Sequence, residues 1–258
     1  MRKIDYVLMD PTGNITILVK TPVAEKMQPG IASMIMEREP SAEQAGFVTL
    51  REDGIAIRMA GGEFCGNAAM SAAALFAMER GIGEGVIDVD FSGTPDPVNV
   101  RVSTLPDGSM KGTVSMPECV SVEEKVLPGG RSCPVVSFEG ISHVIAGTDL
   151  SGKEAEEMIK PWCEYLGSDA LGIMIFDRER ESLSPLVYVP SAGTMFWENS
   201  CASGTSAVGA FLARKEGDVK LSLSQPGGTL QIEAFAEGKL LLSGTVRMLS
   251  EGSITADI

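Results

Sequence analysis

The sequence is poor in residues that bind metals or form the catalytic triads of hydrolases. It contains a single histidine, His143, in 258 residues. One imidazole excludes sites built from several histidines and leaves little room for a Ser–His–Asp hydrolase. The five cysteines are an odd number, and their spacing fits no zinc pattern. No P-loop or dinucleotide fingerprint occurs either. We therefore expect a protein without a bound metal or cofactor.

Basic clusters and long apolar runs are also missing. The chain has 21 Lys and Arg against 35 Asp and Glu, a net charge of −14. An acidic chain without Lys/Arg clusters is a poor partner for nucleic acid or an anionic membrane. No apolar run approaches the roughly 20 residues that span a bilayer, and Asp5 and Asp10 occupy the place of a signal peptide's apolar segment. We expect a cytoplasmic monomer or homodimer whose partner is a small molecule.

What the chain does contain is an internal repeat. The segments Cys65–Gly81 (CGNAAMSAAALFAMERG) and Cys201–Gly217 (CASGTSAVGAFLARKEG) each run 16 residues from a cysteine to a glycine. Each predicts a helix with small residues at its start, an apolar body and a glycine C-cap. A body so poor in charge indicates a helix that is buried on all sides.

The sequence around these helices repeats as well. Short alternating strands joined by Asp-Gly, Gly-Gly or Glu-Gly turns follow each helix, and the tripeptide GTV occurs at both 112–114 and 244–246. Each half is therefore predicted to be a β-rich layer wrapped around one buried helix. We place the N-terminal half at residues 1–115 and the C-terminal half at 116–248, with the tail 249–258 packing on the first half.

A cysteine at each helix start predicts proton-transfer chemistry. A helix N-terminus presents unpaired N–H groups and a partial positive charge, which lower a thiol's pKa and hold a carboxylate. If pseudo-twofold symmetry brings the two helix starts face to face, Cys65 and Cys201 would flank one small anionic site. One thiolate would then remove the α-proton of an amino acid, and the opposite thiol would protonate the other face of the stabilised carbanion. This pattern predicts a cofactor-independent racemase or epimerase.

Both cysteine motifs resemble those of the diaminopimelate epimerase and proline racemase superfamily, and the resemblance covers nearly the whole chain. GGEFCGNAA at 61–69 is similar to the epimerases' first motif, and SCASGTSA at 200–207 is similar to the racemases' CGTGTSA. The resemblance implies an α+β fold of two pseudo-symmetric β-barrel-like halves, each around a central helix, with an amino acid bound between them.

The same resemblance implies roles for further residues. His143, in GISHV, resembles a family histidine that helps to ionise a cysteine. Glu198 would replace the family's carboxylate near the second cysteine, and Glu63 is a further candidate near the first. The residues expected to bind substrate are Asn14, Gln44, Gly66, Asn67, Ser203, Gly204 and Thr205. The cysteines without a repeat partner, Cys119, Cys133 and Cys163, are interpreted as structural.

The sequence departs from the epimerases where they hold the distal end of diaminopimelate. The Asn and Arg residues of that pocket appear here as Met59, Ile141, Ala170 and Gly193. A pocket without Arg should not accept a second carboxylate. The chain looks closest to the divergent epimerase-like racemases, among them the histidine racemases of opine-type metallophore synthesis. We therefore expect an uncharged or weakly basic substrate such as histidine. Two alternatives are an isomerase of the same fold acting on an unsaturated acid and a non-catalytic amino-acid-binding module.

Overall fold

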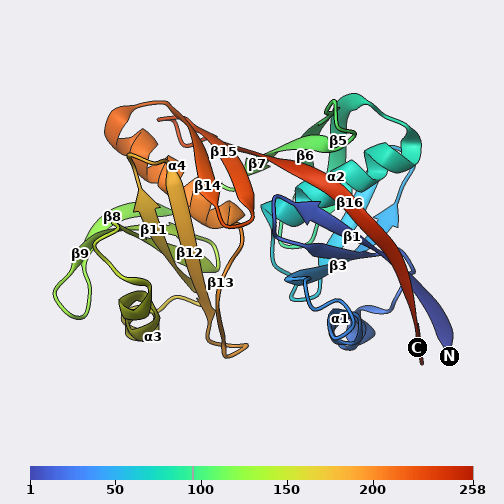
Figure 1. The fold of residues 1–258 in the computed structure, drawn as a ribbon, viewed down its shortest axis with the longest axis horizontal. Helices are drawn as coiled ribbons and strands as arrows, with labels where there is room; N and C mark the ends of the chain where they lie inside the picture. Colours follow the sequence, from blue (N-terminus) through green and yellow to red (C-terminus); the bar gives the residue numbers. More distant parts are fainter. Residues whose placement is uncertain (95, 258) are drawn as a thin grey trace. The chain divides into compact units, whose positions relative to one another are not determined.

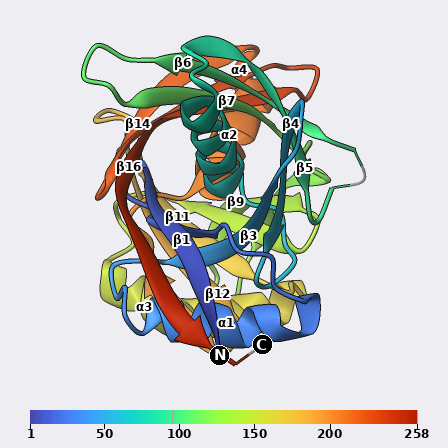
Figure 2. The ribbon, with the colours of Figure 1, turned by 90° about the vertical axis from the view of Figure 1, so that its right-hand side faces the viewer.

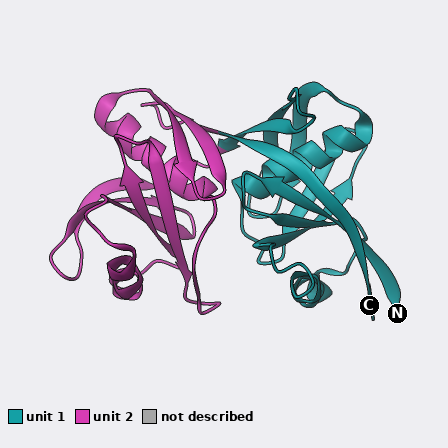
Figure 3. Cartoon of the chain, in the orientation of Figure 1, with its two compact units in different colours: residues 1–115, 243–258 teal, residues 116–242 magenta. Residues whose placement is uncertain are grey.

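The computed structural model describes residues 1–94 and 96–257, which form two compact units (Figure 3). Residues 1–115 and 243–258 make up the N-terminal unit, and residues 116–242 make up the C-terminal unit. The chain returns to the first unit at Ser243, earlier than the predicted boundary at residue 249. Strand β16 (Leu240–Ala256) is continuous, so the chain crosses within one strand rather than in a loop near Met248.

The N-terminal unit is a closed β-barrel. Strand β1 pairs antiparallel with β16, with Arg2 opposite Ala256, and this pairing closes the ring. The other strands, in order around the ring, are β2 (Thr16–Val19), β3 (Gln44–Leu50), β4 (Gly54–Met59), β5 (Glu84–Phe91), β6 (Val98–Thr104) and β7 (Met110–Met116), and β1 spans Arg2–Pro11. Their inward positions alternate with exposed ones, as in a sheet with one buried face.

Helix α2 (Gly66–Arg80) runs through the interior of this barrel (Figure 2). Every residue from Gly66 to Ala77 is buried. Alanine has the highest helix propensity and a very small side chain. An Ala-rich helix therefore forms readily and fits among strands that lie close together. Gly112 of β7 passes so near Met70 that a Cβ would overlap it. The helix ends at Gly81, whose φ of 66° provides the predicted left-handed C-cap.

A short helix covers the outside of the barrel. After the turn η1 (Glu25–Met27), α1 (Gln28–Met36) packs Ile31 and Ile35 onto Ile4, Ile17 and Phe47. The first unit thus has one helix inside its barrel and one outside.

The C-terminal unit repeats this plan with an open sheet. The strand order is β15-β14-β12-β11-β10-β9-β8, and β13 is added to β12. The strands are β8 (Ser121–Val126), β9 (Ser132–Phe138), β10 (Ile141–Ala146), β11 (Leu171–Asp177), β12 (Ser182–Val189), β13 (Thr194–Trp197), β14 (Val219–Gln225) and β15 (Gly228–Ala234).

Its two helices correspond to those of the first unit. Helix α4 (Ala202–Glu216) packs on β14 and β15 (Figure 1). Helix α3 (Gly152–Leu166) lies on the outer side, where Trp162 is buried and donates a hydrogen bond to the carbonyl oxygen of Pro128 at 2.9 Å. The predicted α+β fold, with a central helix in each half, is confirmed. None of the helices in the described part of the chain has the length and apolar composition needed to cross a membrane.

Candidate active site

The two repeat cysteines occupy the same local position, one in each unit. Cys65 is the N-cap of α2 and Cys201 is the N-cap of α4. Their backbones are alike, with φ and ψ of −138° and 116° at Cys65 and −118° and 110° at Cys201. Each carbonyl oxygen accepts the first helical hydrogen bond, from Ala69 at 2.9 Å and from Thr205 at 3.0 Å. The sequence repeat is therefore also a backbone repeat at its two sulfurs.

Cys201 is enclosed by polar groups of its own unit. Its side chain is buried, and its sulfur accepts a hydrogen bond from the backbone N–H of Gly204 at 3.2 Å. The Ser203 hydroxyl lies 3.6 Å from the sulfur. The Glu198 carboxylate is hydrogen-bonded to the Cys201 thiol. Glu198, predicted from its place in the sequence, thus lies at the second cysteine.

Burial decides the protonation state of Cys201. Desolvation, followed by the negative charge of Glu198 and its hydrogen bond, raises the pKa of this thiol well above its ordinary value. The Ser203 hydroxyl and the Gly204 N–H lower the pKa but do not outweigh these effects. The expectation of a lowered pKa at this helix start is wrong for Cys201, because the thiolate form loses more by leaving water than it gains from the N–H groups. Burial and Glu198 therefore favour the protonated thiol form of Cys201.

Cys65 has a more open setting. It is half-buried, and its sulfur does not cap its own helix as that of Cys201 does. Gly66 and Asn67, which follow it, are buried. The preceding Phe64 packs edge-on against Phe91, with 5.0 Å between the ring centroids.

The second carboxylate predicted near a cysteine is Glu63. Glu63 is exposed, and its carboxylate folds back over Gly61. Its role at Cys65 stays a prediction.

Asn14 and Gln44 meet in the N-terminal unit, as two residues of one site should. The Gln44 amide donates to the side-chain oxygen of Asn14 at 2.7 Å and to the hydroxyl of Thr16 at 2.8 Å. Asn14 in turn donates to the carboxylate of Glu43. Glu43, which directly precedes Gln44, was not among the residues predicted from the sequence. This cluster offers a carboxylate and two amides that hold each other in place.

His143 is fully buried on β10. Its ring fills the space left open at Gly172, its partner in the parallel register with β11. Neither ring nitrogen has a hydrogen-bond partner among the described residues, and burial lowers the pKa of His143 to about 3. The Met174 side chain contacts the space at both Gly172 and Gly204. His143 is therefore a neutral imidazole separated from the start of α4 by a thioether, and its role at a cysteine stays a prediction.

The residues after Cys201 divide into two kinds. Ser203 is half-buried beside the sulfur, and Gly204 donates its N–H to the sulfur. Thr205 is fully buried, and its hydroxyl donates to the carbonyl oxygen of Cys201 at 2.7 Å. It also accepts from the amide of Gln225 at 2.9 Å. Thr205 was predicted to bind substrate, but its hydroxyl is committed to the helix start. Gln225 was missed, because its place as an inward residue at the end of β14 carries no sequence signal.

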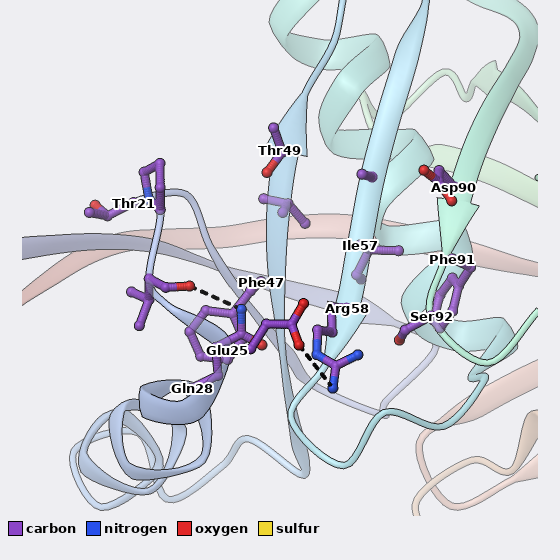
Figure 4. A pocket seen from close by; sticks show the side chains of 14 residues that line it. Thr21, Glu25, Gln28, Phe47, Thr49, Ile57, Arg58, Asp90, Phe91 and Ser92 are labelled. Carbon is purple, nitrogen blue, oxygen red and sulfur yellow. Dashed lines mark hydrogen bonds and ion pairs between the residues drawn. The ribbon is translucent and has the colours of Figure 1, made fainter.

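A separate hollow of about 380 Å³ lies on the N-terminal unit (Figure 4). Among the residues that line it, Glu25 and Arg58 form an ion pair of 3.8 Å, and Gln28 donates to the Val23 carbonyl oxygen at 3.2 Å. None of the predicted site residues lines it. The hollow is therefore not the site of the predicted proton transfer.

Comparisons with known proteins agree on one family. A family model described as the histidine racemase CntK N-terminal domain matches residues 3–255. A histidine racemase of Fusobacterium nucleatum subsp. nucleatum is 32% identical over 262 residues, covering 97% of each chain.

Solved structures share the fold. A "Predicted Epimerase" of Pseudomonas aeruginosa matches with a TM-score of 0.75 and 14% identity, over 98% of this chain and all of that one. A probable proline racemase of Agrobacterium radiobacter matches with a TM-score of 0.71 and 11% identity, over 98% and 93%. At these identities the likeness concerns the architecture alone.

Proposed function

We propose, since this chain belongs to the histidine racemase family and is an amino-acid racemase, that Cys65 and Cys201 invert the α-carbon of its substrate without a cofactor. The observation that carries the proposal is the equivalence of the two cysteines. Each is the N-cap of the buried helix of its own unit, with the same extended backbone. Such a duplicated arrangement supplies one acid and one base of the same chemical kind.

In the proposed reaction the two sulfurs exchange roles. A Cys65 thiolate takes the α-proton, and the Cys201 thiol delivers its proton to the opposite face of the planar carbanion. The N–H groups at the helix starts stabilise the charge that develops on the substrate carboxylate. Afterwards Cys65 is a thiol and Cys201 a thiolate, which is the state needed for the reverse direction. Before the next turnover in the same direction, Cys65 must lose its proton to solvent and Cys201 must regain one. Glu198, which is hydrogen-bonded to Cys201, would take that proton from water and pass it to the thiolate.

The substrate that we propose is histidine. The curated relative with 32% identity is named for it, and the Asn14–Gln44–Glu43 cluster supplies groups suited to an imidazole. A carboxylate can accept the imidazole N–H, and an amide can bond the other nitrogen. Diaminopimelate should not be turned over, because a distal carboxylate without an Arg partner would be desolvated unpaired.

The test follows both the isotope and the stereochemistry. Incubating L-histidine in D2O should give D-histidine by chiral chromatography and loss of the α-proton signal by NMR, on an unchanged carbon skeleton. A binding module would give no exchange, and a double-bond isomerase would exchange only with migration of the bond. Robust turnover of diaminopimelate would show that the pocket positions are misassigned.

Single substitutions test the two-cysteine part. The racemisation rate of Cys65→Ser and of Cys201→Ser should fall about 10²–10⁴-fold, which is the usual contribution of a general acid or base. Cys119→Ser is the matched control, because Cys119 has no repeat partner and should keep the wild-type rate. If either Cys65→Ser or Cys201→Ser folds normally and stays near the wild-type rate, the two-base mechanism is wrong.

A further inference from the structure

We infer that Gln225 is a positioning residue for Cys201, a role that rests on the proposed function of this cysteine. The side-chain oxygen of Gln225 accepts a hydrogen bond from the backbone N–H of Cys201 at 2.9 Å. Its side-chain nitrogen donates to the hydroxyl of Thr205 at 2.9 Å, and that hydroxyl donates to the carbonyl oxygen of Cys201 at 2.7 Å. Both backbone polar groups of Cys201 are thus held in one hydrogen-bonded ring.

The residues of the ring are buried. Gln225 is 7% exposed, Cys201 is 4% exposed and Thr205 is fully buried. Water cannot replace these hydrogen bonds, so the ring holds its geometry more firmly than a surface network would.

The position of Cys201 in the chain explains why such support is needed. The N–H of an N-cap residue has no partner within its helix. At Cys201 this N–H is buried, and Gln225 is the group that satisfies it. Fixing the N–H and C=O of Cys201 fixes its Cα–Cβ direction, and the hydrogen bond from the Gly204 N–H then holds Sγ in one rotamer about that bond. An error of about 1 Å in the place of a reacting group can reduce a rate about 10²-fold.

The other half shows that the fold does not require an amide here. Strands β5 and β14 alternate in the same way, and each ends on its third buried residue, Phe91 in β5 and Gln225 in β14. Phe91 packs on Phe64, the neighbour of Cys65. An apolar residue therefore suffices at this place in the repeat, and the amide in the second half serves the cysteine rather than the architecture.

Gln225→Met tests the inference, because methionine has a similar length and lacks both hydrogen-bonding groups. We expect kcat for histidine to fall at least about tenfold while KM changes by less than about threefold. Alkylation of Cys201 by iodoacetamide, followed by peptide mass spectrometry, should become several-fold faster, and that of Cys65 should not change. The control is Gln231→Met on the neighbouring strand β15, where both readouts should stay at wild-type values.

Gln225→Glu is the second variant, because it keeps the acceptor for the Cys201 N–H and loses the donor to Thr205. It should lie between wild type and Gln225→Met in kcat, and it decides the question if Gln225→Met does not fold. Wild-type kcat and wild-type Cys201 alkylation in a folded variant would overturn the positioning role. Failure of the proposed function gives a different result, since Cys201→Ser would then remain active whatever Gln225→Met does.

Discussion

At Cys201, two effects of opposite sign act on one sulfur. The helix start and the Gly204 N–H favour the thiolate, and this kind of interaction contributes about 0.3–1 kcal/mol at an exposed helix end. Full burial shifts a pKa by up to about 3–5 units, with about 1.4 kcal/mol for each unit. Burial therefore wins, and Cys201 rests as a thiol next to Glu198. Burial also acts on His143, where the described residues offer no hydrogen-bond partner and the neutral ring is favoured.

We predict that His143 makes the protein less stable in mild acid. Its pKa is about 3 in the folded protein and about 6.5 in an unfolded chain. Between these values the unfolded chain binds a proton that the native protein does not. The free energy of unfolding should therefore fall as the pH drops below 6.5, by up to about 1.4 kcal/mol per pH unit.

Urea unfolding between pH 7.5 and 5 measures this slope, because His143 is the chain's single histidine and most carboxylates stay ionised there. His143→Leu should flatten the slope in this window. An equal slope in His143→Leu would mean that another group is responsible.

At the scale of elements, the helices that carry the cysteines begin differently from the helix that only supports the fold. Helix α3 begins with a capping box, in which Ser151 accepts from the Glu154 N–H and Glu154 accepts from the Ser151 N–H. Helices α2 and α4 begin with cysteine, which is not among the favoured N-caps. Their stability comes from burial inside their units, and their starts are available for chemistry.

We therefore predict that Ser151→Ala separates stability from activity. Losing the cap should lower the free energy of unfolding by about 1 kcal/mol, and kcat for histidine should not change because α3 carries no site residue. Chemical denaturation and a racemase assay on the same preparation check both parts. A large fall in kcat without unfolding would contradict the purely structural role of this helix.

At the scale of the whole molecule, the residues of the proposed mechanism come from both units. Cys65, Asn14 and Gln44 belong to the first, while Cys201 and Glu198 belong to the second. A racemase of this design needs both units folded, and neither half contains an acid–base pair of cysteines by itself.

If the two sulfurs act on one carbon atom, they should also react with each other. We predict that mild oxidation abolishes activity and that a reductant restores it, because two thiols on either side of a small substrate can form a disulfide after modest closure. Peptide mass spectrometry should then find Cys65 linked to Cys201. Links made only among Cys119, Cys133 and Cys163 would count against the mechanism. Cys119→Ser should remain as sensitive to oxidation as wild type.

The amino-acid sequence by itself determined the repeat, the two central helices and the cysteines at their starts. These features are local, because an apolar Ala-rich segment between a cysteine and a glycine predicts a buried helix whatever surrounds it. Helices α2 and α4 begin and end where the sequence predicted. The family resemblance rested on the same short motifs, and the match over residues 3–255 confirmed it.

Only the tertiary structure decided what surrounds these helix starts. Gln225 reaches Cys201 from 24 residues away, and Glu43 reaches Asn14 from 29 residues away. The committed hydroxyl of Thr205 and the raised pKa of Cys201 depend on burial as well as on contacts. Burial and distant hydrogen bonds arise only when strands far apart in the chain are brought together, so no local pattern in the sequence could indicate them.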